Sequence, residues 1–93
     1  MKQLNEKVAI VTGAGQGIGK GTALCLAKRG VKIIATGRRP DPIAQTIAQI
    51  KELGGDGIAM TCDSADKNRV EEVVKAAVEK FGTVDVVVNN AQA

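Results

Sequence analysis

The sequence predicts an α/β fold in which one parallel sheet is covered by helices on both faces. Short runs rich in Val, Ile and Ala alternate with longer amphipathic segments, and glycine follows each longer segment. This alternation is typical of strand–helix–strand units with right-handed crossovers, and glycine is common where helices end. We expect a single, incomplete, doubly wound domain over residues 1–93, with strand order 3-2-1-4. The predicted strands cover residues 8–12, 32–36, 57–61 and 84–89, and the predicted helices cover residues 17–29, 43–53 and 67–81.

Local patterns support the individual elements. The first strand contains Val-Ala-Ile-Val, an uncharged run suited to burial on both faces of a parallel sheet. Pro40 and Pro42 stop the second strand and let the next helix begin. The third helix carries apolar side chains at helical spacing, which we predict to belong to the core: Val70, Val73, Val74, Ala77, Val78 and Phe81.

Residues 12–19, Thr-Gly-Ala-Gly-Gln-Gly-Ile-Gly, form a glycine-rich turn between the first strand and the first helix. Unpaired N–H groups and the positive end of the helix dipole make such a turn suited to a pyrophosphate. A triphosphatase loop would need glycine and a hydroxyl where Ala14 and Gly21 stand, so that class is excluded. A turn that needs glycine only for its shape is the alternative. The coincidence of strand, turn and helix favours the phosphate site.

The residues of this turn are expected to have different roles. Gly13 allows the tight turn, Gly17 lets the backbone approach the pyrophosphate, and Gly19 permits close packing of the helix on the strand. Gln16 either covers the phosphate or ribose or is a solvated loop side chain. The predicted cofactor-binding residues of this segment are therefore Gly13, Gly15, Gln16, Gly17, Ile18 and Gly19.

The end of the second strand indicates which dinucleotide, NAD or NADP, such a site would take. An acidic residue there would bind the ribose 2′-hydroxyl of NAD, but Gly37 occupies the place. Arg38 and Arg39 follow, and a guanidinium group pairs well with a 2′-phosphate. We therefore predict NADP(H) in preference to NAD. The alternative is that the two arginines form a solvated turn before the proline.

Two motifs resemble those of the short-chain dehydrogenase/reductase family. The family's cofactor loop, T-G-x-x-x-G-x-G, is matched completely by residues 12–19. Its N-N-A-G motif after the fourth strand is matched by Asn89, Asn90 and Ala91, with Gln92 in place of the glycine. The resemblance covers the whole chain. It implies a Rossmann-type fold and an oxidoreductase that transfers hydride between a nicotinamide cofactor and a carbonyl or secondary alcohol.

The resemblance also implies roles for residues after the third and fourth strands. Asp63 would hold the adenine amino group, and Ser64 would contribute its backbone. Alternatively, Asp63 or Ser64 helps to cap the third helix, near Asp66. Asn90 would line the adenosine ribose, and Asn89 would steady the sheet.

Catalysis in this family uses a tyrosine, a lysine four residues later, a serine and an asparagine. The sequence contains no tyrosine, so no catalytic residue is assigned, and we expect the 93-residue chain to bind a nucleotide without reducing a substrate. Three hypotheses follow. The chain is the amino-terminal part of an NADP-dependent oxidoreductase, a nucleotide-binding module that functions alone, or a structural or interaction domain that no longer binds.

Composition limits the partners of the chain. The net charge is +3, and the basic residues are spread along the sequence, which argues against a nucleic-acid-binding face. No apolar run is long enough to span a membrane. Cys25 and Cys62 are expected as reduced, partly buried thiols of a cytoplasmic protein, with no metal site. We expect a longer parent protein to be a homo-oligomer, and this chain to self-associate through an exposed edge strand at residues 86–88.

Overall fold

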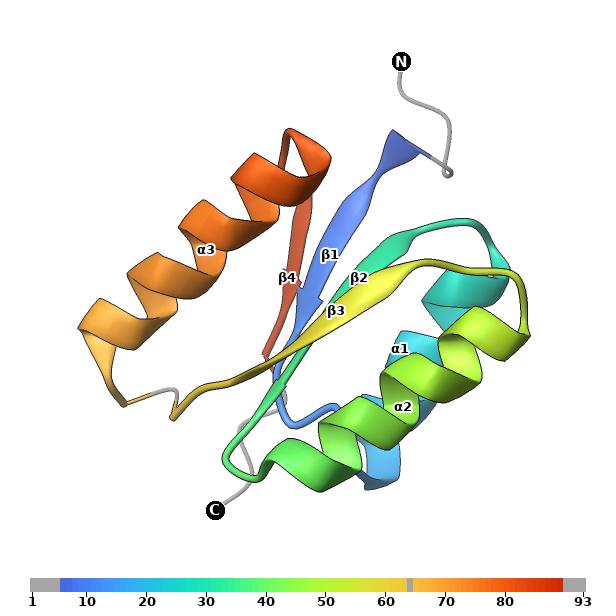
Figure 1. The fold of residues 1–93 in the computed structure, drawn as a ribbon, viewed down its shortest axis with the longest axis horizontal. Helices are drawn as coiled ribbons and strands as arrows, with labels where there is room; N and C mark the ends of the chain where they lie inside the picture. The colour runs from blue at the N-terminus through green and yellow to red at the C-terminus, as the bar shows by residue number, and fades with distance from the viewer. Residues whose placement is uncertain (1–5, 64, 90–93) are drawn as a thin grey trace.

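The computed structural model describes residues 6–63 and 65–89 as a parallel sheet with helices on both faces (Figure 1). The order of the strands is β3-β2-β1-β4, and every pairing is parallel, as predicted. The strands are β1 (Val8–Val11), β2 (Lys32–Gly37), β3 (Gly57–Thr61) and β4 (Val86–Val88). The helices are α1 (Gly17–Lys28), α2 (Pro40–Glu52) and α3 (Lys67–Phe81).

The helices divide the core into two layers. Figure 1 shows α1 and α2 on one side of the sheet and α3 on the other. Alternate residues of β1 supply the two layers, because successive side chains of a strand point to opposite faces. Ala9 and Val11 pack with buried residues of α1 and α2, whereas Val8 and Ile10 pack with Val73 and Ala77 of α3.

The register brings the carboxyl ends of the central strands to one edge of the sheet. Ile10 lies opposite Ile34 of β2 and opposite Val87 of β4. The segment that leaves β1 therefore emerges between the tips of two neighbouring strands. In a doubly wound sheet, this is the position at which ligands bind.

Most predicted boundaries agree with the structure to within one residue, but the start of α2 and the start of β4 were wrong by more. Helix α2 begins at Pro40 rather than at residue 43, so both prolines lie in its first turn. Proline is tolerated there because the first N–H groups of a helix have no partner within the helix. Strand β4 covers Val86–Val88 rather than residues 84–89, and Asp85 before it accepts a hydrogen bond from the backbone N–H of Val8 at 2.9 Å.

Only part of the apolar stripe of α3 is buried. Val73 and Ala77 are buried, but Val70, Val74 and Val78 are exposed, so the prediction that the whole stripe is core was wrong. Among the described residues, α3 is the only helix on its side of the sheet. In this part of the chain, no second helix therefore covers the flanks of α3.

Other expectations can be compared with the described residues. Cys25 and Cys62 are free thiols, but Cys25 on α1 is exposed rather than partly buried. The part of the chain that the structure describes contains no helix long and apolar enough to cross a membrane. Gly82 ends α3 in the left-handed conformation with φ of 87°, as expected for a glycine after a helix.

Candidate functional site

The turn after β1 depends on glycine. Gly13 and Gly17 have φ of 61° and 60°, in the left-handed region that favours glycine. At Gly19, an added Cβ would overlap the carbonyl oxygen of Gly13, so the first turn of α1 packs directly on the end of β1. Space is open around Gly17, where no atom would lie within 4 Å of an added Cβ. These conformations agree with the shape that we expected of a phosphate-binding turn.

Hydrogen bonds from other elements hold the turn in place. The backbone N–H of Ala14 donates to the carbonyl oxygen of Thr36 on β2 at 3.0 Å. The hydroxyl of Thr46 on α2 donates to the carbonyl oxygen of Ala14 at 2.8 Å. The hydroxyl of Thr12 lies 3.2 Å from Oδ1 of Asn89 and 3.3 Å from the carbonyl oxygen of Val88, so it links the ends of β1 and β4. The sequence did not indicate the role of Thr46, because its partner lies on another element.

The N-terminus of α1 faces the turn without a competing acidic group. Gln16 is its N-cap residue, and its side chain makes no capping hydrogen bond. The first turn of α1 contains no acidic residue. The positive end of the helix dipole is therefore directed at this edge of the sheet, where it can stabilise an anion.

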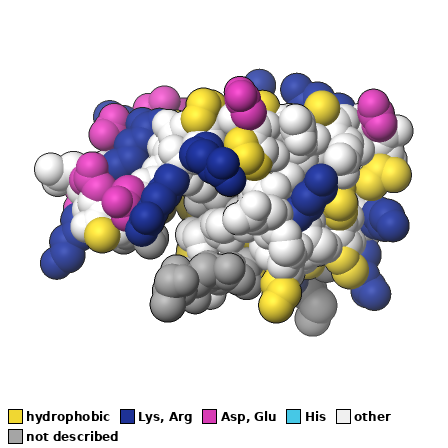
Figure 2. All heavy atoms as spheres, turned by 90° about the horizontal axis from the view of Figure 1, so that it is seen from below, with side chains coloured by type: hydrophobic (Ala, Val, Ile, Leu, Met, Phe, Trp, Pro, Cys, Tyr) yellow, Lys and Arg dark blue, Asp and Glu magenta, His cyan; other side chains and the backbone are white. Residues whose placement is uncertain are grey.

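A cavity of about 450 Å³ extends from the glycine turn to the tip of β2 and the face of α3. Figure 2 looks onto this edge of the molecule, where Lys and Arg side chains border a central area of backbone and uncharged side chains. The lining combines polar groups of the turn with apolar side chains. The lining includes Gly13, Gly15, Gln16, Gly17, Arg38 and Arg39.

The remaining predicted residues lie elsewhere. Gly19 is buried under the turn, and Ile18 is 71% exposed; neither lines the cavity. Asp63 lies in a second, shallower hollow beside Arg38. Ser64 and Asn90 lie outside the described residues, as does Gln92.

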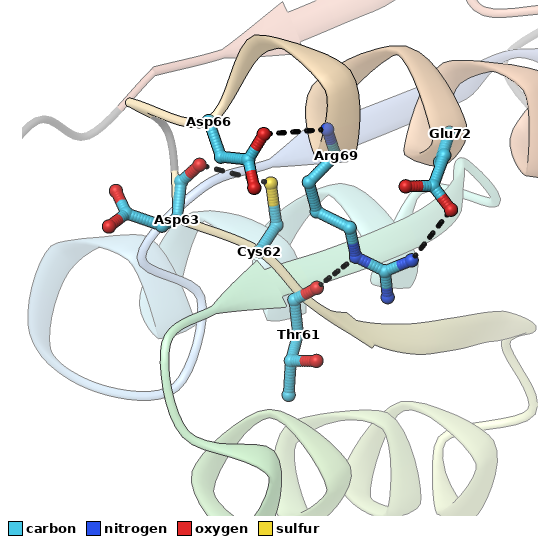
Figure 3. Close-up of polar contacts among 6 residues, drawn as sticks. All are labelled: Thr61, Cys62, Asp63, Asp66, Arg69 and Glu72. Carbon is cyan, nitrogen blue, oxygen red and sulfur yellow. Dashed lines mark hydrogen bonds and ion pairs between the residues drawn. The ribbon is translucent and has the colours of Figure 1, made fainter.

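The structure assigns the cap of α3 to Asp66 rather than to Asp63. Oδ1 of Asp66 accepts a hydrogen bond from the backbone N–H of Arg69 at 3.1 Å (Figure 3). Oδ1 of Asp63 instead accepts from the backbone N–H of Ala65 at 2.9 Å, within the loop. The alternative in which Asp63 caps the helix was therefore wrong, because Asp66 immediately precedes the first helical residue.

Arg69 connects the start of α3 to the end of β3. Its Nε donates to the carbonyl oxygen of Thr61 at 2.7 Å, and its Nη1 lies 3.6 Å from Oε2 of Glu72 (Figure 3). Cys62 lies between these elements and lines both hollows. Burial raises the pKa of the Cys62 thiol, and the positive charge of Arg69 opposes this shift. The described residues contain no group of His, Cys, Asp and Glu that could hold a metal ion.

Comparison with known proteins identifies the family. Residues 7–93 match the family described as short chain dehydrogenase. The chain is a short-chain dehydrogenase family member. Proteins of this oxidoreductase family use nicotinamide dinucleotides as cofactors, so the family agrees with the dinucleotide expected at the glycine turn.

Two curated relatives of this short-chain dehydrogenase family member differ greatly in length. A 3beta-hydroxysteroid dehydrogenase of Mediterraneibacter gnavus is 41% identical over 91 residues, which are 98% of this chain and 33% of that protein. The short-chain dehydrogenase/reductase homolog YusS of Bacillus subtilis is 40% identical over 92 residues, which are 98% of this chain and 84% of YusS. The chain thus spans a third of the length of the first relative and most of the second.

A solved structure shares the fold of this family member. The hydroxysteroid dehydrogenase from Escherichia coli superposes with a TM-score of 0.91 and 33% sequence identity. The match covers 99% of this chain and 41% of the Escherichia coli chain. The parallel sheet and its glycine turn therefore correspond to one part of a larger short-chain dehydrogenase.

Proposed function

We propose that this chain binds NADP(H) and forms the cofactor-binding part of an oxidoreductase that transfers hydride between the cofactor and a carbonyl or secondary alcohol. The observation that carries the proposal is one cavity that joins the glycine turn to Arg38 and Arg39. The turn offers a helix N-terminus to the pyrophosphate, and the arginines offer positive charge to a 2′-phosphate. A cytoplasmic location is part of the same proposal and is supported by the two free thiols.

The residues of the turn fit a pyrophosphate. Gly17 lines the cavity, and no atom would lie within 4 Å of a Cβ added there. A ligand can therefore approach the backbone of Gly17 closely. Gly15 is close to α2, where an added Cβ would lie 2.6 Å from Cβ of Pro42. A side chain at either position would change the shape of this wall of the cavity. Gln16 also lines the cavity, which supports its proposed contact with phosphate or ribose.

The tip of β2 favours NADP(H) over NAD(H). Gly37 carries no carboxylate that would repel a 2′-phosphate, and an added Cβ there would lie 3.0 Å from Cγ2 of Ile43. The Arg38 side chain is 79% exposed and borders the cavity, so its guanidinium group is accessible to a ligand. Two parallel hydrogen bonds from a guanidinium group to a phosphate are among the strong charge-assisted contacts of proteins.

In the proposed reaction, the bound nicotinamide supplies or accepts the hydride. The described residues of this chain bind the dinucleotide and orient it at the carboxyl edge of the sheet. A second candidate function is a nucleotide-binding module that acts alone. It is favoured by the match to YusS, because 84% of that protein is spanned by this chain.

Calorimetric titration with NADPH and NADH tests the proposal. We expect Arg38→Asp to weaken NADPH binding by about tenfold or more, because charge-assisted hydrogen bonds contribute roughly 1.5–3 kcal/mol. NADH binding should be unchanged or tighter, since the new carboxylate can accept from the ribose 2′-hydroxyl.

Lys75→Glu is the matched control, because it changes the net charge equally on an exposed position of α3. It should leave both affinities unchanged. Equal losses for NADPH and NADH in Arg38→Asp would show that Arg38 does not bind the 2′-phosphate. Absence of binding of either cofactor by the unmodified chain would contradict both candidate functions.

A further inference from the structure

Arg38 has a carboxylate partner within the protein. Its Nη2 lies 4.0 Å from Oδ1 of Asp63, and the two side chains are 79% and 50% exposed. The pair joins the tips of adjacent strands, because Gly37 of β2 lies opposite Thr61 of β3. The backbone N–H of Cys62 donates to the carbonyl oxygen of Gly37 at 2.8 Å and keeps the two tips together. The ion pair therefore lies where the cavity meets the second hollow.

The two partners are held unequally. Oδ1 of Asp63 accepts from the backbone N–H of Ala65 at 2.9 Å, so the carboxylate belongs to a local turn. The end of β3, just before it, is fixed by the hydrogen bond from Arg69 to the carbonyl oxygen of Thr61. For Arg38, the ion pair with Asp63 is the one polar contact recorded among the described residues. The acid is thus the positioned partner, and the arginine is the one that can turn toward a ligand.

No other cation neutralises Asp63 in the described part of the chain. Figure 3 shows the carboxylate of Asp63 directed away from the guanidinium group of Arg69. Arg69 instead pairs with Glu72 at 3.6 Å. Among the described residues, Asp63 therefore forms its ion pair with Arg38, the same residue that is proposed to bind the 2′-phosphate.

We propose that Asp63 is a specificity-determining residue that acts through Arg38 and lowers the preference of the chain for NADP(H) over NAD(H). This inference rests on the proposed binding of a 2′-phosphate by Arg38. A phosphate that pairs with Arg38 competes with the carboxylate of Asp63 and is repelled by it, whereas NAD(H), with a 2′-hydroxyl, meets neither effect.

Asp63→Asn tests the inference with little change in structure. The amide oxygen of Asn can still accept from Ala65, so the turn is preserved and only the charge is removed. The measured quantity is the ratio of the dissociation constants for NADH and NADPH, determined by calorimetry. Both cofactors carry the same adenine, so a lost adenine contact cancels in the ratio. We expect Asp63→Asn to shift the ratio about two- to fivefold toward NADPH, the range typical of exposed ion pairs.

Two comparisons separate this effect from a general change of charge. Asp66→Asn removes a carboxylate from the same loop and retains an acceptor for the backbone N–H of Arg69, and it should leave the ratio unchanged. In an Arg38→Gln background, Asp63→Asn should no longer shift the ratio toward NADPH. The shift should also decrease as salt is added, because exposed charges are screened.

The possible results are distinguishable. Selective tightening of NADPH by Asp63→Asn, lost with Arg38→Gln, supports the inference. If the unmodified chain prefers NADPH but Asp63→Asn leaves the ratio unchanged or moves it toward NADH, the inference is overturned and the proposed function stands. If the unmodified chain binds neither cofactor, both are overturned. Should circular dichroism show that Asp63→Asn is unfolded, Asp63→Ser supplies the same test, because its hydroxyl can accept from Ala65.

Discussion

Gly13 and Gly19 lie in close backbone contact at the candidate site. The left-handed φ of Gly13 turns the chain out of β1, and Gly19 allows α1 to return directly over it. The contact depends on the absence of side-chain atoms at Gly19, since an added Cβ would meet the backbone carbonyl of Gly13 rather than a flexible side chain. Individual atoms therefore determine the shape of the phosphate-binding turn.

A pair of glycine substitutions in α1 tests this packing. Gly19→Ala should destabilise the protein by about 1–3 kcal/mol through overpacking and should weaken cofactor binding by moving the turn. Gly21→Ala is the control, because nothing lies within 4 Å of its added Cβ and alanine favours the helix by roughly 0.5–1 kcal/mol. Chemical denaturation followed by circular dichroism gives both stabilities. Equal stabilities for the two variants would refute the close contact.

Helix α2 connects the glycine turn to the tip of β2. Its prolines occupy the first turn, and the buried hydroxyl of Thr46 lies one turn farther along. Thr46 reaches the carbonyl oxygen of Ala14 at 2.8 Å and that of Pro42 at 3.2 Å. Through these contacts, one helix holds the backbone of the turn between β1 and α1.

Thr46→Val removes the hydroxyl with almost no change of shape. It should lower the free energy of unfolding by about 1–3 kcal/mol, because the carbonyl oxygen of Ala14 loses a buried partner. Cofactor affinity should fall as well, since the turn is then held from one side only. Thr46→Ser retains the hydroxyl and should recover most of the affinity, as measured by calorimetry. Unchanged affinity in Thr46→Val would show that the hydrogen bond does not support the binding site.

In the described part of the molecule, the side of the sheet that carries α3 is incompletely covered. Strand β4 lies at the edge of the sheet, with Val86 and Val87 exposed by 42% and 60%. Val87 lies opposite Ile10, which packs with Val73 and Ala77 of α3, so Val87 lies on the same side of the sheet as the exposed valines of that helix. An unpaired strand edge beside apolar surface favours association with other chains.

We therefore predict concentration-dependent self-association, measurable by sedimentation velocity. Val86→Lys should reduce it, because a charged side chain on an edge strand disfavours pairing with a second strand. Val86 does not line the cavity, so cofactor affinity should be retained and serves as the control for folding. An unmodified chain that remains monomeric at every concentration would contradict the prediction.

Local sequence patterns predicted the elements, the sheet order and the position of the glycine turn. Their periodicity and glycine spacing are properties of neighbouring residues, and the structure confirms that order. The same patterns overestimated the buried face of α3, because periodicity shows which side of a helix is apolar but not what covers it. They also placed the start of α2 too late, because two prolines were interpreted as a boundary rather than as a first helical turn.

The sequence by itself thus determined the family, the fold and the turn that is proposed to bind pyrophosphate. Each of these follows from short motifs or from the alternation of strand and helix patterns, which depend on residues that are neighbours in the chain. Only the tertiary structure showed that Thr46 supports Ala14, that Asp66 caps α3, and that Asp63 pairs with Arg38. The Thr46 and Asp63 contacts join different elements, and the cap depends on where α3 begins. The Thr46 and Asp63 contacts form only after the strands have paired and brought their carboxyl ends to one edge of the sheet.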